Sequence, residues 1–286
     1  MECYKCLLDN SVSKMHYLDG KWFCEECYSL LLNPLNYEKM QYEFEMYVEQ
    51  IKEKNKEKKY DVLFALSGGK DSIAALYFTI EKYNLRPLAF TVDHGYKNQT
   101  IWDNCRTVVE HYNLDWFILK IDSPTVKKIG CLSKEGDLPC CHCNKLWKGR
   151  YFAKAISMTG ITDLFIGGDT LEKHTAIIAR PDYQTDTVGL PLPLNIKTEK
   201  DIYEVAYSLG WKDPQTKGWD TDCIAVGMAL RKYRSDSGRV HVEEVKHLSH
   251  RVRYGILEKE EAKNMLMRPI VVTEALEREF LNAIED

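Results

Sequence analysis

Six consecutive residues, Ser67-Gly-Gly-Lys-Asp-Ser72, combine the groups that a phosphate-binding loop needs. They follow the apolar run 60–66, so the sequence predicts a buried strand, a glycine turn and a helix start. Adjacent glycines let the backbone approach an anion, and the first N–H groups of the helix point at it. Lys70 adds a positive charge, and Asp71 can hold Mg²⁺ beside the phosphates. The residues expected to bind a nucleotide here are Ser67, Gly68, Gly69, Lys70, Asp71 and Ser72.

The hexapeptide resembles the signature of the N-type ATP pyrophosphatases, also called PP-loop enzymes. An ordinary kinase loop fits less well, because the Walker pattern places Ser or Thr after the lysine and Asp71 stands there instead. The resemblance implies that ATP is split between its α and β phosphates and that AMP passes to a substrate oxygen. Lys70 would balance charge on the pyrophosphate, and Mg²⁺ would bridge the phosphates and Asp71 or Asp169. A purely structural glycine turn is the alternative.

Four cysteines near the N-terminus have the spacing of a zinc site. Cys3-x-x-Cys6 and Cys24-x-x-Cys27 are separated by 17 residues. Each pair can form a tight knuckle, and two knuckles supply four thiolates to a tetrahedral ion. Such a closed site has no open position for catalysis, and a small module can fold around it. We therefore expect a structural Zn²⁺ ion with a docking role; four unrelated buried thiols are the alternative.

Downstream of residue 60, short apolar segments alternate with amphipathic ones. The expected strands include residues 87–92, 115–121 and 163–167, and the expected helices include residues 99–112, 144–158 and 198–210. This alternation is typical of a parallel sheet with helices on both faces. The predicted fold class is therefore α/β with a doubly wound parallel sheet, and the resemblance to the PP-loop enzymes implies the adenine nucleotide alpha hydrolase type. The expected parts are a small N-terminal zinc-binding module (1–32), a connecting helix (33–59), the PP-loop domain (60–225) and a helical C-terminal region (226–286).

Polar residues follow three of the expected strands. Ser67, Asp93 and Asp169 each stand just past a strand, and ligands of parallel sheets bind at the carboxyl ends of strands. We expect Asp93 to line the adenosine pocket. Gly168 and Asp169 are expected to complete the nucleotide site.

A second group of cysteines lies between an expected strand and an expected helix. Cys140-Cys141-His142-Cys143 precedes the helix, and Cys223 follows much later. Cys140, Cys143 and Cys223 supply three thiolates, which would leave an open position on an iron of a cluster or on a zinc ion. Cys141 and His142 could substitute as ligands. A second structural zinc site and uncoordinated core thiols remain the alternatives.

Residues 139–150 resemble the Cys-x-x-Cys segment and basic helix of the iron–sulfur-dependent tRNA thiolation enzymes of the PP-loop superfamily. The resemblance implies a 4Fe–4S cluster on Cys140, Cys143 and Cys223, whose free iron carries the transferable sulfur. Two positions depart from that pattern. Trp147-Lys148 replaces an Arg pair, and Gly167-Gly168-Asp169-Thr-Leu-Glu172 replaces Gly-His-x-x-Asp-Asp, which leaves the handling of metal and substrate open.

A longer part of the chain resembles the N-acetyl sugar amidotransferases, which use ammonia from a separate glutaminase to turn an acetamido sugar into an acetamidino sugar. The shared features are the N-terminal knuckles, the long helix, the phosphate loop, and segments 209–219 and 252–262. We expect sulfur transfer, because an ammonia-using enzyme has no chemical need for three thiolates beside its nucleotide. The predicted function is adenylation of a carbonyl oxygen of tRNA or a small molecule, followed by sulfur insertion at the cluster. An amidotransferase with a glutaminase partner is the alternative, and a non-catalytic ATP-sensing module is the third hypothesis.

The 286 residues are 44% hydrophobic and 29% charged, as in a globular chain. No apolar run approaches the ~18–20 residues that cross a bilayer, and the N-terminus lacks the layout of a signal peptide. We expect a cytoplasmic protein without a membrane partner. In that compartment clustered cysteines bind metal in preference to forming disulfides.

The substrate is less well determined by the sequence. Residues 231–253 carry seven Lys or Arg against three acids, which predicts a local basic face. Such a face could bind tRNA phosphates or a nucleotide-linked sugar, or could be a solvated helix pair. The apolar stripe 271–284 fits either core packing or the face of a homodimer. No residue pattern identifies the sulfur donor.

Overall fold

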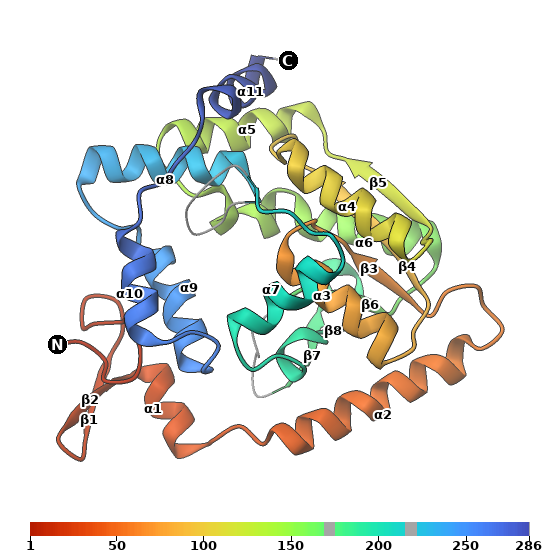
Figure 1. Cartoon of the computed structure of the whole chain (residues 1–286), viewed down its shortest axis with the longest axis horizontal. Coiled ribbons are helices and arrows are strands. Elements are labelled where there is room, and N and C mark those ends of the chain that lie inside the picture. Colours follow the sequence, from red (N-terminus) through yellow and green to blue (C-terminus); the bar gives the residue numbers. More distant parts are fainter. Residues whose placement is uncertain (169–174, 215–221, 286) are drawn as a thin grey trace.

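The computed structural model describes residues 1–168, 175–214 and 222–285. Within these residues a six-stranded sheet runs in the order β5-β4-β3-β6-β8-β7. Neighbours from β5 to β8 pair in parallel, and β7 pairs antiparallel with β8 at one edge. Helices cover both faces of the sheet (Figure 1). The predicted α/β fold class is confirmed, with an antiparallel edge strand that we did not expect.

The strands are β1 (Met15–Leu18), β2 (Lys21–Cys24), β3 (Val62–Ala65), β4 (Pro87–Asp93), β5 (Trp116–Lys120), β6 (Leu164–Ile166), β7 (Ile177–Arg180) and β8 (Thr185–Gly189). The helices are α1 (Glu25–Leu32), α2 (Tyr37–Asn55), α3 (Lys70–Tyr77), α4 (Gln99–His111), α5 (Ser123–Lys134), α6 (Gly149–Thr159), α7 (Glu199–Ser208), α8 (Ile224–Ser237), α9 (Val242–Arg253), α10 (Lys259–Met267) and α11 (Glu274–Glu285). In the described part of the chain, no helix is both long and apolar enough to span a bilayer.

The main core forms between the central strands and helix α2. Strand β3 is a continuous apolar run whose Leu63 and Phe64 are fully buried, as expected for a strand covered on both faces. Helix α2 presents a buried stripe at helical spacing that includes Phe44 and Val48. The ring of Phe44 lies 5.6 Å from that of Phe165 in β6. Helix α2 therefore packs against one face of the sheet.

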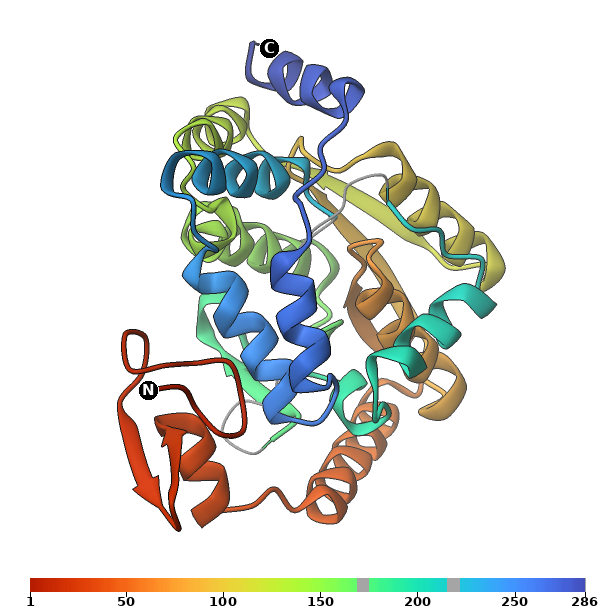
Figure 2. The same cartoon turned by 60° about the vertical axis from the view of Figure 1, so that its left-hand side comes forward.

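The N-terminal module and helices α9 and α10 meet outside the sheet. In the N-terminal module, β1 and β2 pair antiparallel, and α1 follows directly. This module shares a second apolar cluster with Leu248 and Val252 of α9, Leu257 just before α10, and Ala262 of α10. Figure 2 shows the N-terminal module against α9 and α10. The module therefore packs on the helical C-terminal region instead of standing apart.

Helix α7 begins with a capping box that orients Glu199 in its first turn. Thr198 Oγ1 accepts from the N–H of Asp201 (3.3 Å), and the Asp201 carboxylate accepts from the N–H of Thr198 (2.8 Å). We expect Thr198→Ala to lower the free energy of unfolding by about 1 kcal/mol, because the N–H of Asp201 loses its side-chain partner. Denaturant titration measures this, with Lys200→Ala on the exposed face of α7 as the control. Equal stability of the two variants would contradict the prediction.

Candidate nucleotide site and four-cysteine centre

The loop from Ser67 to Ser72 connects β3 to α3 and closes around the hydroxyl of Ser72. Ser72 Oγ donates to the carbonyl of Gly69 (3.0 Å) and accepts from the N–H of Gly68 (3.2 Å). The hydroxyls of Ser67 and Ser72 lie 2.9 Å apart. The hydroxyls of the two serines therefore stabilise the turn through hydrogen bonds within the loop. The first N–H groups of α3 have no carbonyl partner within the helix, so an anion can satisfy them.

Glycine is required in this loop because atoms of other segments lie too close to its backbone to leave room for a Cβ. A Cβ on Gly68, whose φ is +91°, would lie 2.4 Å from the carbonyl oxygen of Ile101 in α4. A Cβ on Gly69 would lie 1.9 Å from the carboxylate of Asp222. At the end of β6, a Cβ on Gly167 would lie 2.4 Å from Cα of Ser72. Asp222, which we did not predict as a site residue, therefore sits directly against the phosphate loop.

Lys70 and Asp71 belong to a network of two cations and two carboxylates. Lys70 Nζ lies 3.0 Å from Asp71 and 3.6 Å from Glu199. Arg251 of α9 lies 2.7 Å from Glu199 and 3.2 Å from Asp71. Burial by itself would lower the pKa of Lys70, but the carboxylates of Asp71 and Glu199 outweigh it and the pKa is raised. The lysine is therefore a cation beside the loop. The sequence patterns revealed neither Glu199 nor Arg251 as part of this site.

A cavity of about 260 Å³ opens beside the loop at the carboxyl ends of β3, β4 and β6. Its lining combines loop, strand-end and aromatic residues, namely Ala65, Leu66, Ser67, Ser72, Phe90, Val92, Lys97, Trp147, Lys148, Phe152, Ile166, Gly167, Gly168 and Tyr183. Lys97 is buried, and its Nζ donates to the carbonyl of Ser67 (2.9 Å). Aromatic walls suit a purine base, and the lysines suit its phosphates. Lys97 is a further residue that we did not predict.

The remaining predicted nucleotide residues occupy different places. Gly168 lines the cavity, and Asp169 lies outside the described residues. The carboxylate of Asp93 accepts from the N–H of Gly95 (2.9 Å), so it caps the turn after β4. Its contact with adenosine stays a prediction. The adjacent His94 is buried, with its ring 5.7 Å from that of Trp147 in the cavity wall.

Burial, helped by the charges of Lys97 and Lys148, lowers the pKa of His94 well below its usual 6.5. The folded chain therefore excludes a proton that the unfolded chain binds, and stability present above about pH 6.5 is lost as the pH falls. Between pH 7.5 and 5.5, we expect the unfolding free energy to fall by up to about 1.4 kcal/mol more in the wild type than in His94→Gln. Denaturant titrations at both pH values measure this. The same pH dependence in both proteins would contradict it.

The second cysteine set lies on segments that neighbour residues of the cavity wall. Cys223 is the N-cap of α8, and its backbone pairs with Lys97 in an isolated antiparallel bridge. Cys140 lies in the helical turn Pro139–Cys141 and packs on the same apolar cluster as Cys223. Cys143 precedes the turn Asn144–Lys148, which carries Trp147 into the cavity wall. None of the three cysteines itself lines the cavity.

The spacing of this second set differs from that of a single-metal site. Thiolates on one tetrahedral zinc ion lie about 3.8 Å apart, as follows from a Zn–S bond of about 2.3 Å. Among the described residues, only the N-terminal set groups three or more potential ligand atoms all within 4.8 Å of one another. Cys140, Cys143 and Cys223 do not form such a group. A shared metal centre on these three thiols stays a prediction.

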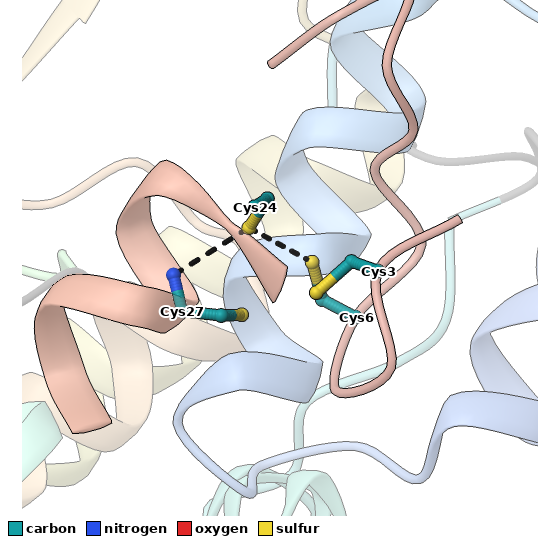
Figure 3. A group of neighbouring side chains, drawn as sticks. All are labelled: Cys3, Cys6, Cys24 and Cys27. Atoms are coloured by element: carbon teal, nitrogen blue, oxygen red, sulfur yellow. Dashed lines mark hydrogen bonds between the residues drawn. The ribbon is translucent and has the colours of Figure 1, made fainter. Parts of the chain in front are cut away.

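The four N-terminal cysteines converge in one buried group. Cys3, Cys6, Cys24 and Cys27 have their sulfur atoms within 4.8 Å of one another. Figure 3 shows Cys24 between the Cys6 side chain and α1. Cys24 Sγ lies 3.6 Å from Cys6 Sγ and accepts from the N–H of Cys27 (3.5 Å). The grouping predicted from the two Cys-x-x-Cys pairs is confirmed.

The protonation of these thiols favours a bound cation. Hydrogen bonding with Cys24 lowers the pKa of Cys6 to about 7 and raises that of Cys27. Four neighbouring thiols cannot all ionise alone, because the thiolates repel one another. A divalent ion would replace the shared protons and stabilise four thiolates together. The donor set therefore fits the predicted Zn²⁺.

The predicted basic face of residues 231–253 is only partly exposed. Arg251 and Arg253 are buried. Arg234 lies 2.5 Å from the buried carboxylate of Glu244, and Arg231 lies 2.7 Å from Glu277. The predicted local basic face therefore contains buried ion pairs as well as surface charge, and its contact with tRNA or a nucleotide-linked sugar stays a prediction. The charge pattern in the sequence did not distinguish internal ion pairs from surface charge.

No protein-family model matches the chain. The uncharacterized protein MJ1599 of Methanocaldococcus jannaschii is 31% identical over 277 residues, which are 97% of each chain. Three solved structures are similar at low identity. The U34-tRNA thiolase NcsA from Methanococcus maripaludis, with its 4Fe–4S cluster, has a TM-score of 0.42 and 17% identity, covering 96% of this chain and 90% of that chain. NMN synthetase from Francisella tularensis has a TM-score of 0.42 and 11% identity, with 87% and 93% covered.

Phosphoadenylyl-sulfate reductase from Candida auris, in a phosphate complex, has a TM-score of 0.37 and 15% identity. It covers 53% of this chain and 73% of its own chain. These values are too low to assign an activity, whereas the match to MJ1599 extends over nearly the whole chain. The chain carries a Ser-Gly-Gly-Lys-Asp-Ser loop at the end of a central parallel strand, and it belongs to the same family as MJ1599.

Proposed function

We propose that this protein is an ATP-using enzyme that adenylates a carbonyl oxygen and then replaces that oxygen with sulfur. The proposal is carried by the cavity beside the phosphate loop. Its wall contains Lys97, whose backbone pairs with Cys223, and Trp147, which follows Cys143 in the chain. Nucleotide chemistry and thiol chemistry would therefore occur side by side. The proposed substrate is a carbonyl group of tRNA or of a small molecule.

In the first step, the substrate oxygen forms a bond to the α phosphorus of ATP, and the bond to the pyrophosphate oxygen breaks. Negative charge grows on the leaving pyrophosphate, next to Lys70 and the first N–H groups of α3. Asp71 is a suitable ligand for Mg²⁺ at these phosphates. Asp169 retains the same proposed role. In the second step, sulfur bonds to the activated carbon while the carbon–oxygen bond to AMP breaks.

Cys140, Cys143 and Cys223 are the residues that would hold a 4Fe–4S cluster. When three thiolates bind such a cluster, one iron keeps an open position for sulfide. A persulfide on one of the three thiols is the simpler variant of the same proposal: its outer sulfur would bond to the carbon, and a second of the three thiolates would then break the S–S bond by forming a disulfide with the first. In either case these thiols must lie within reach of the adenylated carbon. The backbone bridge between Cys223 and Lys97, a residue of the cavity wall, supports that requirement for Cys223.

The first test is anaerobic purification with iron, acid-labile sulfide and zinc measured per chain. We expect about one zinc and about four irons with matching sulfide. We also expect α,β-methylene-ATP to bind in the presence of Mg²⁺. Zinc without iron, even after reconstitution, would contradict the cluster and favour the ammonia-dependent amidotransferase alternative. Turnover with ammonium salts would then decide for that alternative.

The second test compares two neighbouring cysteines. Cys143→Ala is expected to lose sulfur transfer and most of its iron while keeping nucleotide affinity. Cys141→Ala is the matched control, because Cys141 is exposed on the same segment and is not one of the proposed ligands. Thionucleoside analysis of tRNA and pyrophosphate release are the two readouts. Full sulfur transfer by Cys143→Ala would overturn the assignment of the site.

A further inference from the structure

Helix α9 lies between the four-cysteine centre and the nucleotide loop. Its last turn carries Arg251 and Arg253, both buried. Residues two apart on an α-helix point about 200° away from each other around the axis. The two guanidinium groups therefore leave α9 on opposite sides. Each reaches a different site.

On one side, Arg251 holds both carboxylates of the nucleotide network. Its Nη1 lies 2.7 Å from Glu199, and its Nη2 lies 3.2 Å from Asp71. The turn after α9 adds a backbone contact, because the carbonyl of Ile256 accepts from the N–H of Glu199 (2.9 Å). Glu199 is therefore held by α9 and its following turn through both backbone and side chain. The position of α9 determines the position of these charges.

On the other side, α9 contacts both cysteine knuckles. Arg253 Nη2 lies 3.9 Å from Cys24 Sγ and 3.7 Å from Glu26. Ser249 Oγ accepts from the N–H of Leu7, directly after Cys6 (3.2 Å). Lys259 of α10 donates to the carbonyl of Cys3 (2.6 Å). The N-terminal module thus contacts α9 and α10 through residues within or next to the cysteine pairs that a metal ion would hold together.

We propose that metal binding at the four cysteines fixes α9, and that Arg251 thereby orients Lys70 and Asp71 for ATP. Arg251 is a positioning residue, and the four-cysteine centre is a structural part of the nucleotide site. This inference rests on the proposed nucleotide site. It extends the role expected for the zinc module beyond docking.

The charges give the physical reason. Four thiolates on a divalent ion carry a net charge of −2, and Arg253 is placed to offset it as an outer partner of the metal site. Arg251 and Lys70 share two carboxylates, and Arg251 makes the shorter contact with Glu199. With Arg251 in place, Lys70 is available to turn toward pyrophosphate. If α9 shifts, Lys70 pairs more tightly with Asp71 and Glu199, and phosphate affinity falls.

A thermodynamic cycle tests this coupling. The affinity for α,β-methylene-ATP with Mg²⁺ is measured for the wild type and Arg251→Gln, each before and after zinc removal. Metal removal should weaken binding by about 10-fold or more in the wild type, within the range of ordinary site-to-site coupling. Arg251→Gln with zinc should show a similar loss, and zinc removal should then add less than about twofold. Lys246→Gln, on the exposed side of α9, is the control and should behave as the wild type.

Hydrogen exchange of the Ile73 N–H, which donates to the carbonyl of Gly69 (3.1 Å), gives a readout independent of nucleotide. Its exchange should rise in zinc-loaded Arg251→Gln and in metal-free wild type, while β4 stays protected. Two results would overturn the proposal. One is a zinc-loaded Arg251→Gln variant with the nucleotide affinity and the hydrogen exchange of the wild type. The other is an equal loss of nucleotide affinity on zinc removal in the wild type and in Arg251→Gln. If the analogue binds to no form, the proposed nucleotide site has failed, and the exchange data alone decide whether the metal centre is coupled to α3.

Discussion

Cys24→Ser is expected to remove the metal from the four-cysteine centre and to unfold the N-terminal module. The serine hydroxyl does not ionise to replace a thiolate, and three remaining thiolates leave the ion without a closed shell. Apparent binding free energies of structural zinc are about 10–16 kcal/mol in small domains, where they serve as folding free energy. The module has little apolar core of its own apart from the cluster shared with α9 and α10. We therefore expect its fold to depend on a bound ion.

Zinc content and hydrogen exchange measure this effect. Residues 1–32 should lose protection in Cys24→Ser, whereas β3 and β4 should keep theirs because they belong to a separate core. Cys131→Ser is the matched control, since Cys131 is exposed on α5 and distant in the sequence from the group. One zinc per chain with wild-type affinity in Cys24→Ser would contradict the prediction.

Lys97→Met is expected to lower the adenylation rate by about 10²–10³-fold. Lys97 is buried in the cavity wall, and its ammonium is held 2.9 Å from the carbonyl of Ser67 at the start of the phosphate loop. A buried positive charge stabilises the negative charge that develops in phosphoryl transfer more strongly than an exposed one, because water does not screen it. Methionine keeps much of the side-chain volume and removes the charge.

Pyrophosphate release in single turnovers measures the loss, and thermal unfolding checks that the variant is folded. Lys145→Met is the control, because Lys145 is an exposed lysine on the turn that carries Trp147. The control should retain its rate within about twofold, as expected for a surface charge. A wild-type rate in Lys97→Met would remove this lysine from the mechanism.

Features that depend on neighbouring residues could be predicted from the sequence. The phosphate loop is a turn between one strand and the next helix, so Ser67 to Ser72 revealed it directly. The Cys-x-x-Cys spacing predicted the grouping of Cys3, Cys6, Cys24 and Cys27, whose sulfur atoms lie within 4.8 Å of one another. Strand β8 was missed because its residues, Thr185-Asp-Thr-Val-Gly189, form no apolar run.

Contacts between distant parts of the chain could not be predicted in this way. Arg251 lies 180 residues from Asp71, and nothing in the charge pattern of residues 231–253 distinguished its buried ion pair from a solvated charge. The position of Lys97 in the cavity wall could not be predicted from the sequence. It depends on the backbone bridge to Cys223 and on the hydrogen bond to the carbonyl of Ser67 after β3. Asp222 likewise meets Gly69 across a long stretch of chain.

The sequence by itself determined the phosphate loop, the cysteine knuckles and the α/β class, because each follows from turn chemistry, ligand spacing or the period of apolar residues over short distances. Only the tertiary structure decided which charges surround Lys70 and which helix connects the cysteines to the loop. Those contacts depend on how α7 and α9 pack, and packing is settled by the burial of many side chains together.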